Sequence, residues 1–260
     1  MNKATASRDQ LILEEVLRTG SVSVEELATS LVVSSATIRR DLTDLEQQGL
    51  LRRVRGGAVP IESIHSDLFL QDSLFKEAMR EHQAEKRRIA LAAAELVQDG
   101  DTIALASSTT VALLARSLRH RKKISVVTNN MNVALELSQR KGISVLVAGG
   151  YLRGNRFSIV GPATLDTIRS IKVDKAFFGM SGIDPVRGFT AKNEDEAVVN
   201  RAMIGQAKMT VAIGDHSKFG TVARILVCPP EEVDLLITDT GADEAAVARF
   251  EEMGTRVWQV

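Results

Sequence analysis

The segment from residue 24 to residue 57 places the tightest limits on how this chain can fold. It holds two short stretches with apolar residues at helical spacing, then a basic segment that ends in paired glycines. Ser23 and Glu26 form a capping box that predicts the start of the first of these helices. Ser34 is a good N-cap for the second. The order helix, turn, helix and basic hairpin is typical of a winged helix-turn-helix.

The second of these helices divides into two faces of different chemistry. At 100° per residue, Ile38, Leu42 and Leu45 fall on one face, and small or basic residues fall on the other. Such a face suits a helix in the major groove of double-stranded DNA. In the wing that follows, period two is expected to place Arg53 and Arg55 on one side, available to phosphates. The candidate DNA-contacting residues are Ser35, Ala36, Thr37, Arg39, Arg40, Thr43, Arg52, Arg53 and Arg55.

A solvated helix pair with a charged loop is the competing interpretation, but three capped helices, an exposed arginine face and a basic wing in this order favour DNA binding. Composition sets further limits. The 260 residues carry 33 basic and 33 acidic side chains, so DNA contacts have to come from a local patch. The one cysteine, Cys228, follows an apolar run and is interpreted as a core residue. No run approaches the roughly 20 apolar residues of a membrane span, and the start lacks the apolar centre of a signal peptide, so we expect a cytoplasmic protein. The four histidines are scattered without metal-ligand spacing, so no metal or other cofactor is expected.

Domain boundaries follow from changes in the pattern. We expect a winged helix-turn-helix domain over residues 1–58, with the helix-turn-helix at about 22–41 and the wing at about 50–57. A linker over 59–77 and an α/β domain over 78–260 are expected to follow. Residues 75–97 are predicted to form one helix, on which the basic run 86–88 would ordinarily be a solvated face.

From residue 101 onward, short apolar runs alternate with helical stretches. The predicted strands are residues 102–106, 124–128, 144–148, 175–178, 210–213, 235–238 and 256–260, and the predicted helices are 111–118, 131–139, 164–171, 194–207 and 243–253. This alternation predicts a doubly wound, mainly parallel sheet. Ligands of such sheets bind at the carboxyl ends of the strands.

Polar or glycine-rich loops follow five of the predicted strands. Four hydroxyl residues at 107–110 open a helix, which predicts an anion site, for phosphate above all. In the other loops, glycines allow close approach of the backbone, carboxamides and carboxylates can bind sugar hydroxyls, and cations can neutralise phosphate. The candidate effector-binding residues are Ser107, Ser108, Thr109, Thr110, Asn129, Gly149, Gly150, Arg153, Gly182, Asp184, Asp215 and Lys218.

Motifs in both halves are similar to those of one family. The stretch V-S-S-A-T-I-R-R-D-L at 33–42 with its R-V-R-G-G-A wing resembles the DeoR family of bacterial repressors. The C-terminal half is similar to the same family through S-S-T-T, T-N, G-G-x-x-R, V-G-P, D-K-A-F-x-G-x-x-G-I-D and D-x-S-K-F-G, which lie at 107–110, 128–129, 149–153, 160–162, 174–184 and 215–220. The resemblance covers nearly the whole chain.

The resemblance implies a DNA-binding domain followed by an effector domain that shares a fold with ribose-5-phosphate isomerase. It also adds Lys86 to the candidate effector-binding residues. The chain departs from the family pattern at Arg55, where histidine is usual, and at Leu105-Ala106, where many relatives carry an aspartate before the hydroxyl loop.

These observations favour a transcriptional regulator that represses a carbohydrate catabolic operon and whose operator binding is modulated by a phosphorylated sugar or a related metabolite. One small DNA-binding domain supplies few contacts, so a homo-oligomer, a dimer or tetramer, is expected. Two alternatives stay open. A sugar-phosphate isomerase-like enzyme with a vestigial DNA-binding domain would need a carboxylate base, for which Asp184, Glu194, Asp195, Glu196 and Asp215 are available. A DNA-binding regulator without an effector is the other.

Overall fold

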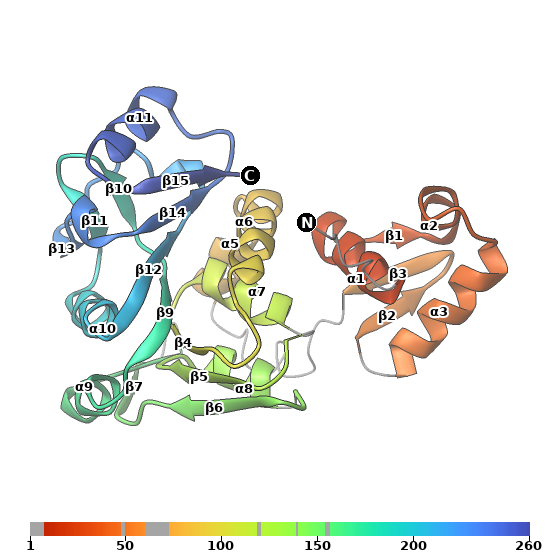
Figure 1. Ribbon diagram of the computed structural model, residues 1–260, viewed down its shortest axis with the longest axis horizontal. Coiled ribbons are helices and arrows are strands. Elements are labelled where there is room, and N and C mark those ends of the chain that lie inside the picture. The colour runs from red at the N-terminus through yellow and green to blue at the C-terminus, as the bar shows by residue number, and fades with distance from the viewer. Residues whose placement is uncertain (1–7, 48–49, 61–72, 119–120, 139, 154–156) are drawn as a thin grey trace. The chain divides into compact units, whose positions relative to one another are not determined.

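The computed structural model describes residues 8–47, 50–60, 73–118, 121–138, 140–153 and 157–260 (Figure 1). Contacts divide the chain into an N-terminal unit, Met1–Ile64, and a C-terminal unit, His65–Val260. Within the described residues, no helix is long and apolar enough to cross a membrane.

The N-terminal unit is a small helical domain with a three-stranded antiparallel sheet. Its elements are α1 (Arg8–Thr19), β1 (Val22–Ser23), α2 (Val24–Ser30), α3 (Ser35–Gln47), β2 (Leu51–Val54) and β3 (Gly57–Pro60), with strand order β1-β3-β2. The predicted capping box is confirmed, because Ser23 Oγ accepts from Glu26 N at 3.1 Å and Glu26 Oε2 accepts from Ser23 N at 3.1 Å. All three helices and β2 contribute to one buried apolar cluster, which includes Ile12, Leu27 and Ile38.

The wing is a hairpin of β2 and β3, in which Arg53 pairs with Ala58. Its turn decides where the arginine side chains lie. Arg55 lies in the two-residue turn, not in a strand. The expected period-two placement of Arg53 and Arg55 on one strand face is therefore wrong, because β2 ends at Val54.

The C-terminal unit is built on a seven-stranded parallel sheet. Its strands are β4 (Thr102–Leu105), β5 (Ile124–Thr128), β6 (Ile143–Val147), β9 (Val173–Phe178), β12 (Ala207–Ile213), β14 (Leu235–Thr238) and β15 (Arg256–Gln259). The strand order is β15-β14-β12-β9-β4-β5-β6. All neighbouring pairs are parallel, which confirms the predicted doubly wound sheet. The order reverses between β4 and β9, and ligands of open α/β sheets bind at such a switch point.

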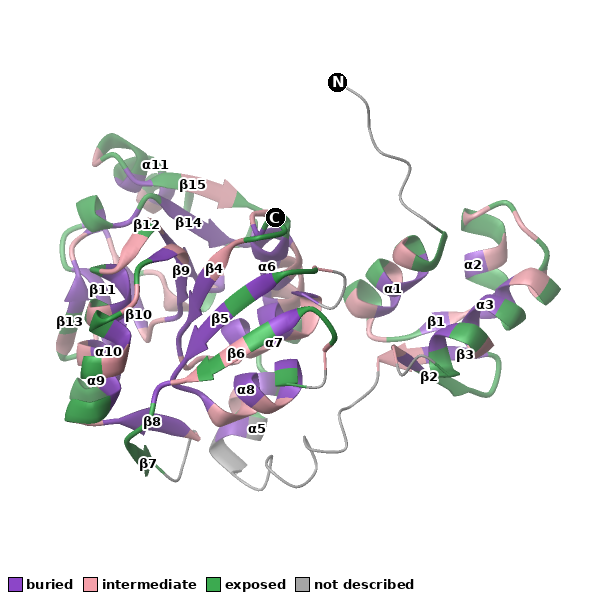
Figure 2. Ribbon diagram, turned by 60° about the horizontal axis from the view of Figure 1, so that its bottom comes forward, coloured by how far each residue is buried: buried purple, intermediate pink, exposed green. Residues whose placement is uncertain are grey.

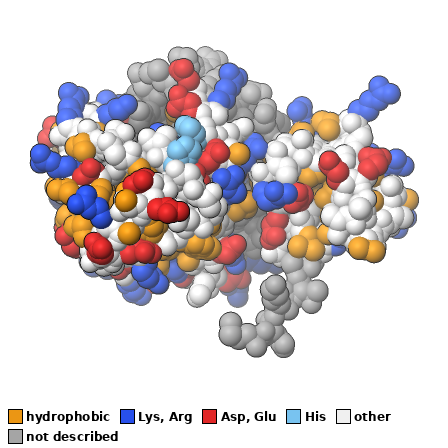
Figure 3. All heavy atoms as spheres, turned by 90° about the horizontal axis from the view of Figure 1, so that it is seen from above, with side chains coloured by type: hydrophobic (Ala, Val, Ile, Leu, Met, Phe, Trp, Pro, Cys, Tyr) orange, Lys and Arg blue, Asp and Glu red, His pale blue; other side chains and the backbone are white. Residues whose placement is uncertain are grey.

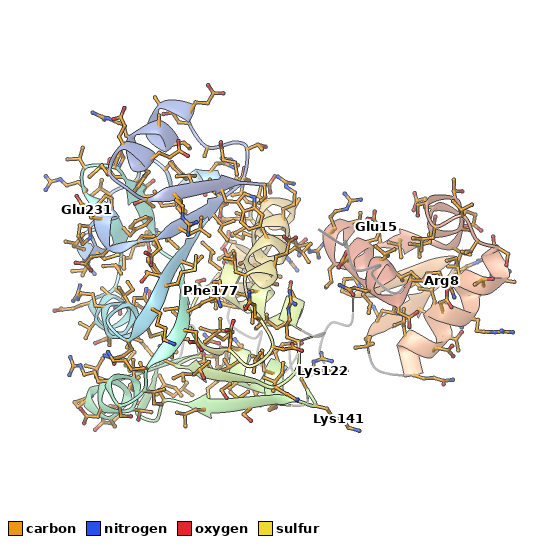
Figure 4. The ribbon with its side chains drawn as sticks, viewed as in Figure 1. Arg8, Glu15, Lys122, Lys141, Phe177 and Glu231 are labelled. Carbon is orange, nitrogen blue, oxygen red and sulfur yellow. The ribbon has the colours of Figure 1, made fainter. Side chains whose placement is uncertain are left out.

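Helices cover both faces of this sheet. The helices are α5 (Ser73–Arg80), α6 (Gln83–Glu95), α7 (Thr109–Ser117), α8 (Met131–Ser138), α9 (Pro162–Arg169), α10 (Glu194–Ile204) and α11 (Glu244–Glu252). Phe177 packs with α5 to α8, and its neighbour Phe178 packs with α9 to α11 on the other face. Figure 2 shows the central strands buried between the two layers, and Figure 4 shows Phe177 in the middle of the unit.

Three features depart from the sequence-based expectations. The single helix expected over 75–97 is two helices, α5 and α6, with His82 between them at a φ of +48°. A hairpin of β7 (Tyr151–Arg153) and β8 (Ser158–Val160) was not expected, nor was a small antiparallel sheet of β10 (Gly182–Asp184), β11 (Gly188–Ala191) and β13 (Ile225–Cys228). Cys228, at the end of β13, is 1% exposed, which confirms its interpretation as a core residue.

Candidate DNA-binding surface and effector pocket

Helix α3 buries its apolar face and exposes the opposite one, as predicted. Ile38, Leu42 and Leu45 are each at most 1% exposed. Among the candidate DNA contacts on this helix, Ala36, Arg39 and Arg40 are exposed, while Ser35, Thr37 and Thr43 are half-buried. A helix of this kind can present its first two turns to the base edges of a major groove.

The turn before α3 fixes where this helix begins. Ser34 Oγ accepts from Thr37 N at 3.1 Å and lies 2.9 Å from Thr37 Oγ1, so Thr37 also takes part in the cap. Val32, which is 88% exposed, supplies the reversal of direction with a φ of +55°. This conformation is costly for a β-branched residue.

Asp41 of the T-I-R-R-D-L motif is a structural residue. Its carboxylate accepts two hydrogen bonds from the guanidinium of Arg8, at 2.5 Å from Nε and 2.9 Å from Nη2. This bidentate pair ties the start of α1 to the middle of α3, and Figure 4 marks Arg8 in the N-terminal unit. Nothing in the spacing of the sequence indicated the contact, because 33 residues separate the two partners.

The wing is attached to α3 through Arg53. Its backbone N–H donates to Glu46 Oε1 at 2.8 Å, and its Nη1 donates to Thr43 Oγ1 at 2.7 Å. Two candidate DNA contacts, one on the helix and one on the wing, are thus held together. The exposed cations of this surface are Arg39, Arg40, Arg52, Arg53 and Arg55.

A pocket of about 200 Å³ lies in the C-terminal unit at the carboxyl ends of β4, β9 and β12. These three strands are neighbours in the sheet, and the switch point lies between the first two. Of the predicted effector-binding residues, Lys86, Ser107, Ser108, Thr109, Thr110, Asp215 and Lys218 line the pocket. Lining residues that were not predicted are Phe75, Ala78, Glu81, Gly179, Met180, Ser181, Lys192, Ile213 and Gly214.

The N-terminus of α7 forms part of the pocket lining. Ser108 Oγ caps the helix by accepting from Val111 N at 3.1 Å, and Ser107 Oγ accepts from Asn130 Nδ2 at 2.7 Å. The first N–H groups of a helix have no partner within the helix and favour an anion. Two lysines, Lys192 and Lys218, also line this pocket and can neutralise such a ligand.

A buried carboxylate and a buried ammonium also line the pocket. Asp215 is fully buried, and its Oδ1 accepts from Ser217 N at 3.1 Å and from the Ser217 hydroxyl. Its Oδ2 has no hydrogen-bond partner among the described residues and lies 3.9 Å from Lys86 Nζ. An unpaired buried acceptor is costly and suits a ligand that brings a donor, such as a hydroxyl.

Lys86 is 2% exposed, so the expectation of a solvated face is wrong at this residue. Its Nζ donates to the carbonyls of Ala78 at 2.6 Å and Glu81 at 2.9 Å. Burial lowers the pKa of this ammonium, the Asp215 carboxylate opposes that shift, and the neighbouring Lys218 adds to it. The site therefore gains from a ligand that brings negative charge or further acceptors.

Three of the predicted residues after β5 and β6 do not line this pocket. Asn129 is buried and donates from Nδ2 to the carbonyl of Ile159 at 3.0 Å. A side chain at Gly150 would meet Thr164 Oγ1 at 2.3 Å, so this position packs against α9. In the part of the chain that the structure describes, nothing lies within 4 Å of where a Cβ of residue 149 would be.

The remaining three predicted residues have contacts elsewhere. Gly182 and Asp184 belong to β10, and Asp184 Oδ1 accepts from the backbone N–H groups of residues 186 and 187, at 2.9 and 2.7 Å. Arg153 on β7 is exposed and lies 4.0 Å from Asp195. The five predicted loops therefore do not form one site. Only the loops that follow adjacent strands at the switch point meet at the pocket.

The carboxylates that an isomerase would need do not converge either. Asp184 closes a turn, and Glu194, Asp195 and Glu196 lie in the first turn of α10. Of the five candidates, Asp215 alone lines the pocket. Among the described residues, no group of histidine, cysteine or carboxylate side chains has the arrangement of a metal site.

The two units define a DNA-binding protein with an α/β ligand-binding domain, and comparison with known proteins gives its family. The model of the DeoR-like helix-turn-helix domain matches residues 8–64, and that of the DeoR C terminal sensor domain matches residues 81–240. The chain belongs to the DeoR family of transcriptional regulators.

Several curated relatives are similar over almost their whole length. The putative aga operon transcriptional repressor of Escherichia coli O157:H7 is 32% identical over 97% of this chain and 93% of its own. The transcriptional repressor GlcR of Bacillus subtilis is 35% identical over 90% and 88%, and the glycerol-3-phosphate regulon repressor of Escherichia coli K12 is 35% identical over 88% of both chains. These relatives are regulators, and so is this chain; it is not an enzyme.

Solved structures show weaker likeness. Ribose 5-phosphate isomerase from Plasmodium falciparum is 17% identical with a TM-score of 0.39 over 52% of each chain. The full-length sorbitol operon regulator SorC from Klebsiella pneumoniae is 15% identical with a TM-score of 0.35, over 76% of this chain and 85% of its own.

Proposed function

We propose that this regulator represses a carbohydrate operon and that its C-terminal unit binds a phosphorylated sugar or a related phosphorylated metabolite. The observation that carries the proposal is the pairing of two chemistries in one pocket. The N-terminus of α7 with its four hydroxyl residues suits a phosphate, and the unpaired Asp215 Oδ2 beside Lys86 suits a polyol. The printed names of the relatives, which include an aga operon repressor and a glycerol-3-phosphate regulon repressor, support the same class of ligand.

The departure at Leu105-Ala106 fits this proposal. Both residues are fully buried and apolar, so they offer no carboxylate to the pocket. Asp215, from the loop after β12, supplies a carboxylate instead. A ligand hydroxyl that donates to Asp215 Oδ2 would satisfy the unpaired acceptor.

On the DNA side, the exposed face of α3 and the wing arginines bind the operator. Each chain has one α3, so we propose that a homo-oligomer, a dimer or tetramer, binds repeated half-sites. Effector binding changes operator affinity through a coupling free energy between the two sites, typically about 1–3 kcal/mol.

A thermal-shift screen of the full-length protein tests the effector class. The panel contains triose, pentose and hexose phosphates, each beside its unphosphorylated parent. At 100 times its dissociation constant a ligand stabilises by about 2.7 kcal/mol, which raises the unfolding midpoint by roughly 5–11 °C at 2–4 °C per kcal/mol. The double variant Ser108→Ala, Lys218→Ala should lose the shift. A panel without a phosphate-dependent shift contradicts the proposed ligand class.

A further inference from the structure

Helix α5 forms one wall of the effector pocket. Phe75, Ala78 and Glu81, from the helix and the residue after it, line the pocket, while Phe75 and Met79 reach into the apolar core. With eight residues, α5 is too short to be stable by itself in water. Its order therefore depends on contacts with the rest of the C-terminal unit.

The C-terminal end of α5 is held by groups from outside the helix. Lys86 Nζ donates to the carbonyls of Ala78 and Glu81. Carbonyls at the end of a helix have no partner within the helix, so these hydrogen bonds satisfy them. The next residue, His82, has a φ of +48°, and its side chain makes no capping hydrogen bond to α6. A residue in this conformation persists when its surroundings hold it there.

The ring of His82 contacts the ring of His216. The two ring centroids lie 4.8 Å apart at an interplanar angle of 81°, an edge-to-face pair that links the α5–α6 junction to the loop after β12. His82 is exposed and His216 is half-buried, and Figure 3 shows the described histidine side chains together on one face of the C-terminal unit.

His216 is fixed in turn by Asp239, at the end of β14. Asp239 Oδ1 accepts from His216 N at 2.8 Å, and Oδ2 lies 2.7 Å from His216 Nδ1 and accepts from Gly241 N at 3.0 Å. Burial would raise the pKa of Asp239, but these hydrogen bonds outweigh it and the pKa lies below its usual value. A Cβ at position 241 would lie 2.9 Å from both His216 Nδ1 and Asp239 Oδ2, so the arrangement also needs glycine there.

We propose that His82, His216 and Asp239 are positioning residues that hold α5 as a wall of the effector pocket, and that occupancy of the pocket tightens α5. This rests on the proposed function of the pocket. Lys86 has three N–H donors, two of which serve the carbonyls near the end of α5. A bound anion or hydroxyl offers the third an acceptor.

Hydrogen–deuterium exchange of the full-length, ligand-free protein tests the positioning role. His82→Asn keeps a residue that tolerates positive φ but removes the ring, whereas His82→Phe keeps a ring. We expect amide exchange over residues 77–81 to rise at least tenfold in His82→Asn and to stay near wild type in His82→Phe. Exchange over α11, none of whose residues lines the pocket, should not change in either variant.

Asp239→Asn tests the second link, with Asp243→Asn as the matched control. Asp243 caps α11 by accepting from Ala246 N, and asparagine caps as well as aspartate. In the wild type we expect His216 to carry its proton on Nδ1, as seen by side-chain nitrogen NMR. Asp239→Asn should remove that preference and raise exchange over α5, and the control should do neither.

Several outcomes would overturn the proposal. Wild-type exchange over α5 in His82→Asn, or a rise in His82→Phe alone, would mean that the ring contact does not hold α5. An equal rise over α5 and α11 would mean that the cluster supports the whole unit. None of these depends on a ligand, so the positioning role can fail while the proposed effector class stands. With a sugar phosphate that the thermal screen identifies, unchanged exchange over α5 would overturn its tightening.

Discussion

Replacing Gly179 by alanine adds a single methyl group, and we expect this change to weaken effector binding without changing DNA binding. It follows β9 and lies against the residue that caps α7, with space for no side chain. A Cβ at 179 would lie 2.4 Å from Ser108 Oγ and 2.5 Å from Ser108 Cβ. Gly149, after β6, has no described atom within 4 Å of the corresponding place and provides a matched control for the same substitution.

The cost of Gly179→Ala follows from these distances. Non-bonded carbon atoms rest at about 3.5–4.0 Å, so Ser108 has to move by about 1 Å. Overpacking of this kind costs about 1–3 kcal/mol, and loss of the Ser108 cap costs about 1 kcal/mol more. A total of about 2–4 kcal/mol lowers the unfolding midpoint of a domain of this size by roughly 4–16 °C. Loss of one charge-assisted hydrogen bond to the ligand weakens its binding by roughly tenfold or more.

Both quantities can be measured on the full-length protein. Thermal unfolding gives the midpoint, and calorimetric titration with a sugar phosphate from the thermal screen gives the affinity. Gly179→Ala should lower both and leave DNA affinity without ligand unchanged, whereas Gly149→Ala should change none of the three. Equal losses in the two variants, or no loss in Gly179→Ala, would refute the assignment of the pocket to the β4–β9 switch point.

Three further predictions concern single side chains. Val32→Asn should stabilise the N-terminal unit by about 1 kcal/mol in chemical denaturation, since asparagine tolerates the positive φ better than valine; a destabilised variant would contradict this. Burial raises the pKa of the Cys228 thiol to about 12, so it should resist a thiol reagent at pH 8 until the protein unfolds; labelling of the native protein would count against it. Arg40→Ala should relax sequence preference in a binding-site selection, whereas Arg53→Ala should reduce the salt dependence of operator binding by about one phosphate contact; wild-type behaviour of both would exclude α3 and the wing as the DNA-contacting elements.

The sequence predicted the central sheet well because burial on both faces makes each parallel strand a short apolar run. The small sheet of β10, β11 and β13 lacked that signal, since its strands have only three or four residues and include Gly182 and Gly188. The break between α5 and α6 was also invisible to periodicity. At this break His82 contacts the ring of His216, and Lys86 Nζ donates to the carbonyl of Glu81; the spacing of apolar residues indicates neither contact.

The difference between local sequence pattern and tertiary arrangement also explains which pocket residues could be predicted. The sequence indicates that polar loops follow strands, but it does not give the strand order. Ser107–Thr110 and Asp215 line the same pocket because β4, β9 and β12 are adjacent at the switch point. Gly149 and Arg153 follow β6, two strands away from β4, and do not line it. Lys192 was missed because it follows β11, a strand that the sequence did not reveal.

Operator affinity measured with and without effector tests most directly whether a sugar phosphate regulates DNA binding by this protein. A duplex selected by the protein from a random-sequence pool is titrated with the full-length protein, with each sugar phosphate of the panel and without it. We predict that at least one sugar phosphate changes the affinity by roughly 5–150-fold. The Ser108→Ala, Lys218→Ala variant should bind the duplex like wild type and show no such change. An affinity that is unchanged by every compound, or a double variant that no longer binds DNA, would contradict the account.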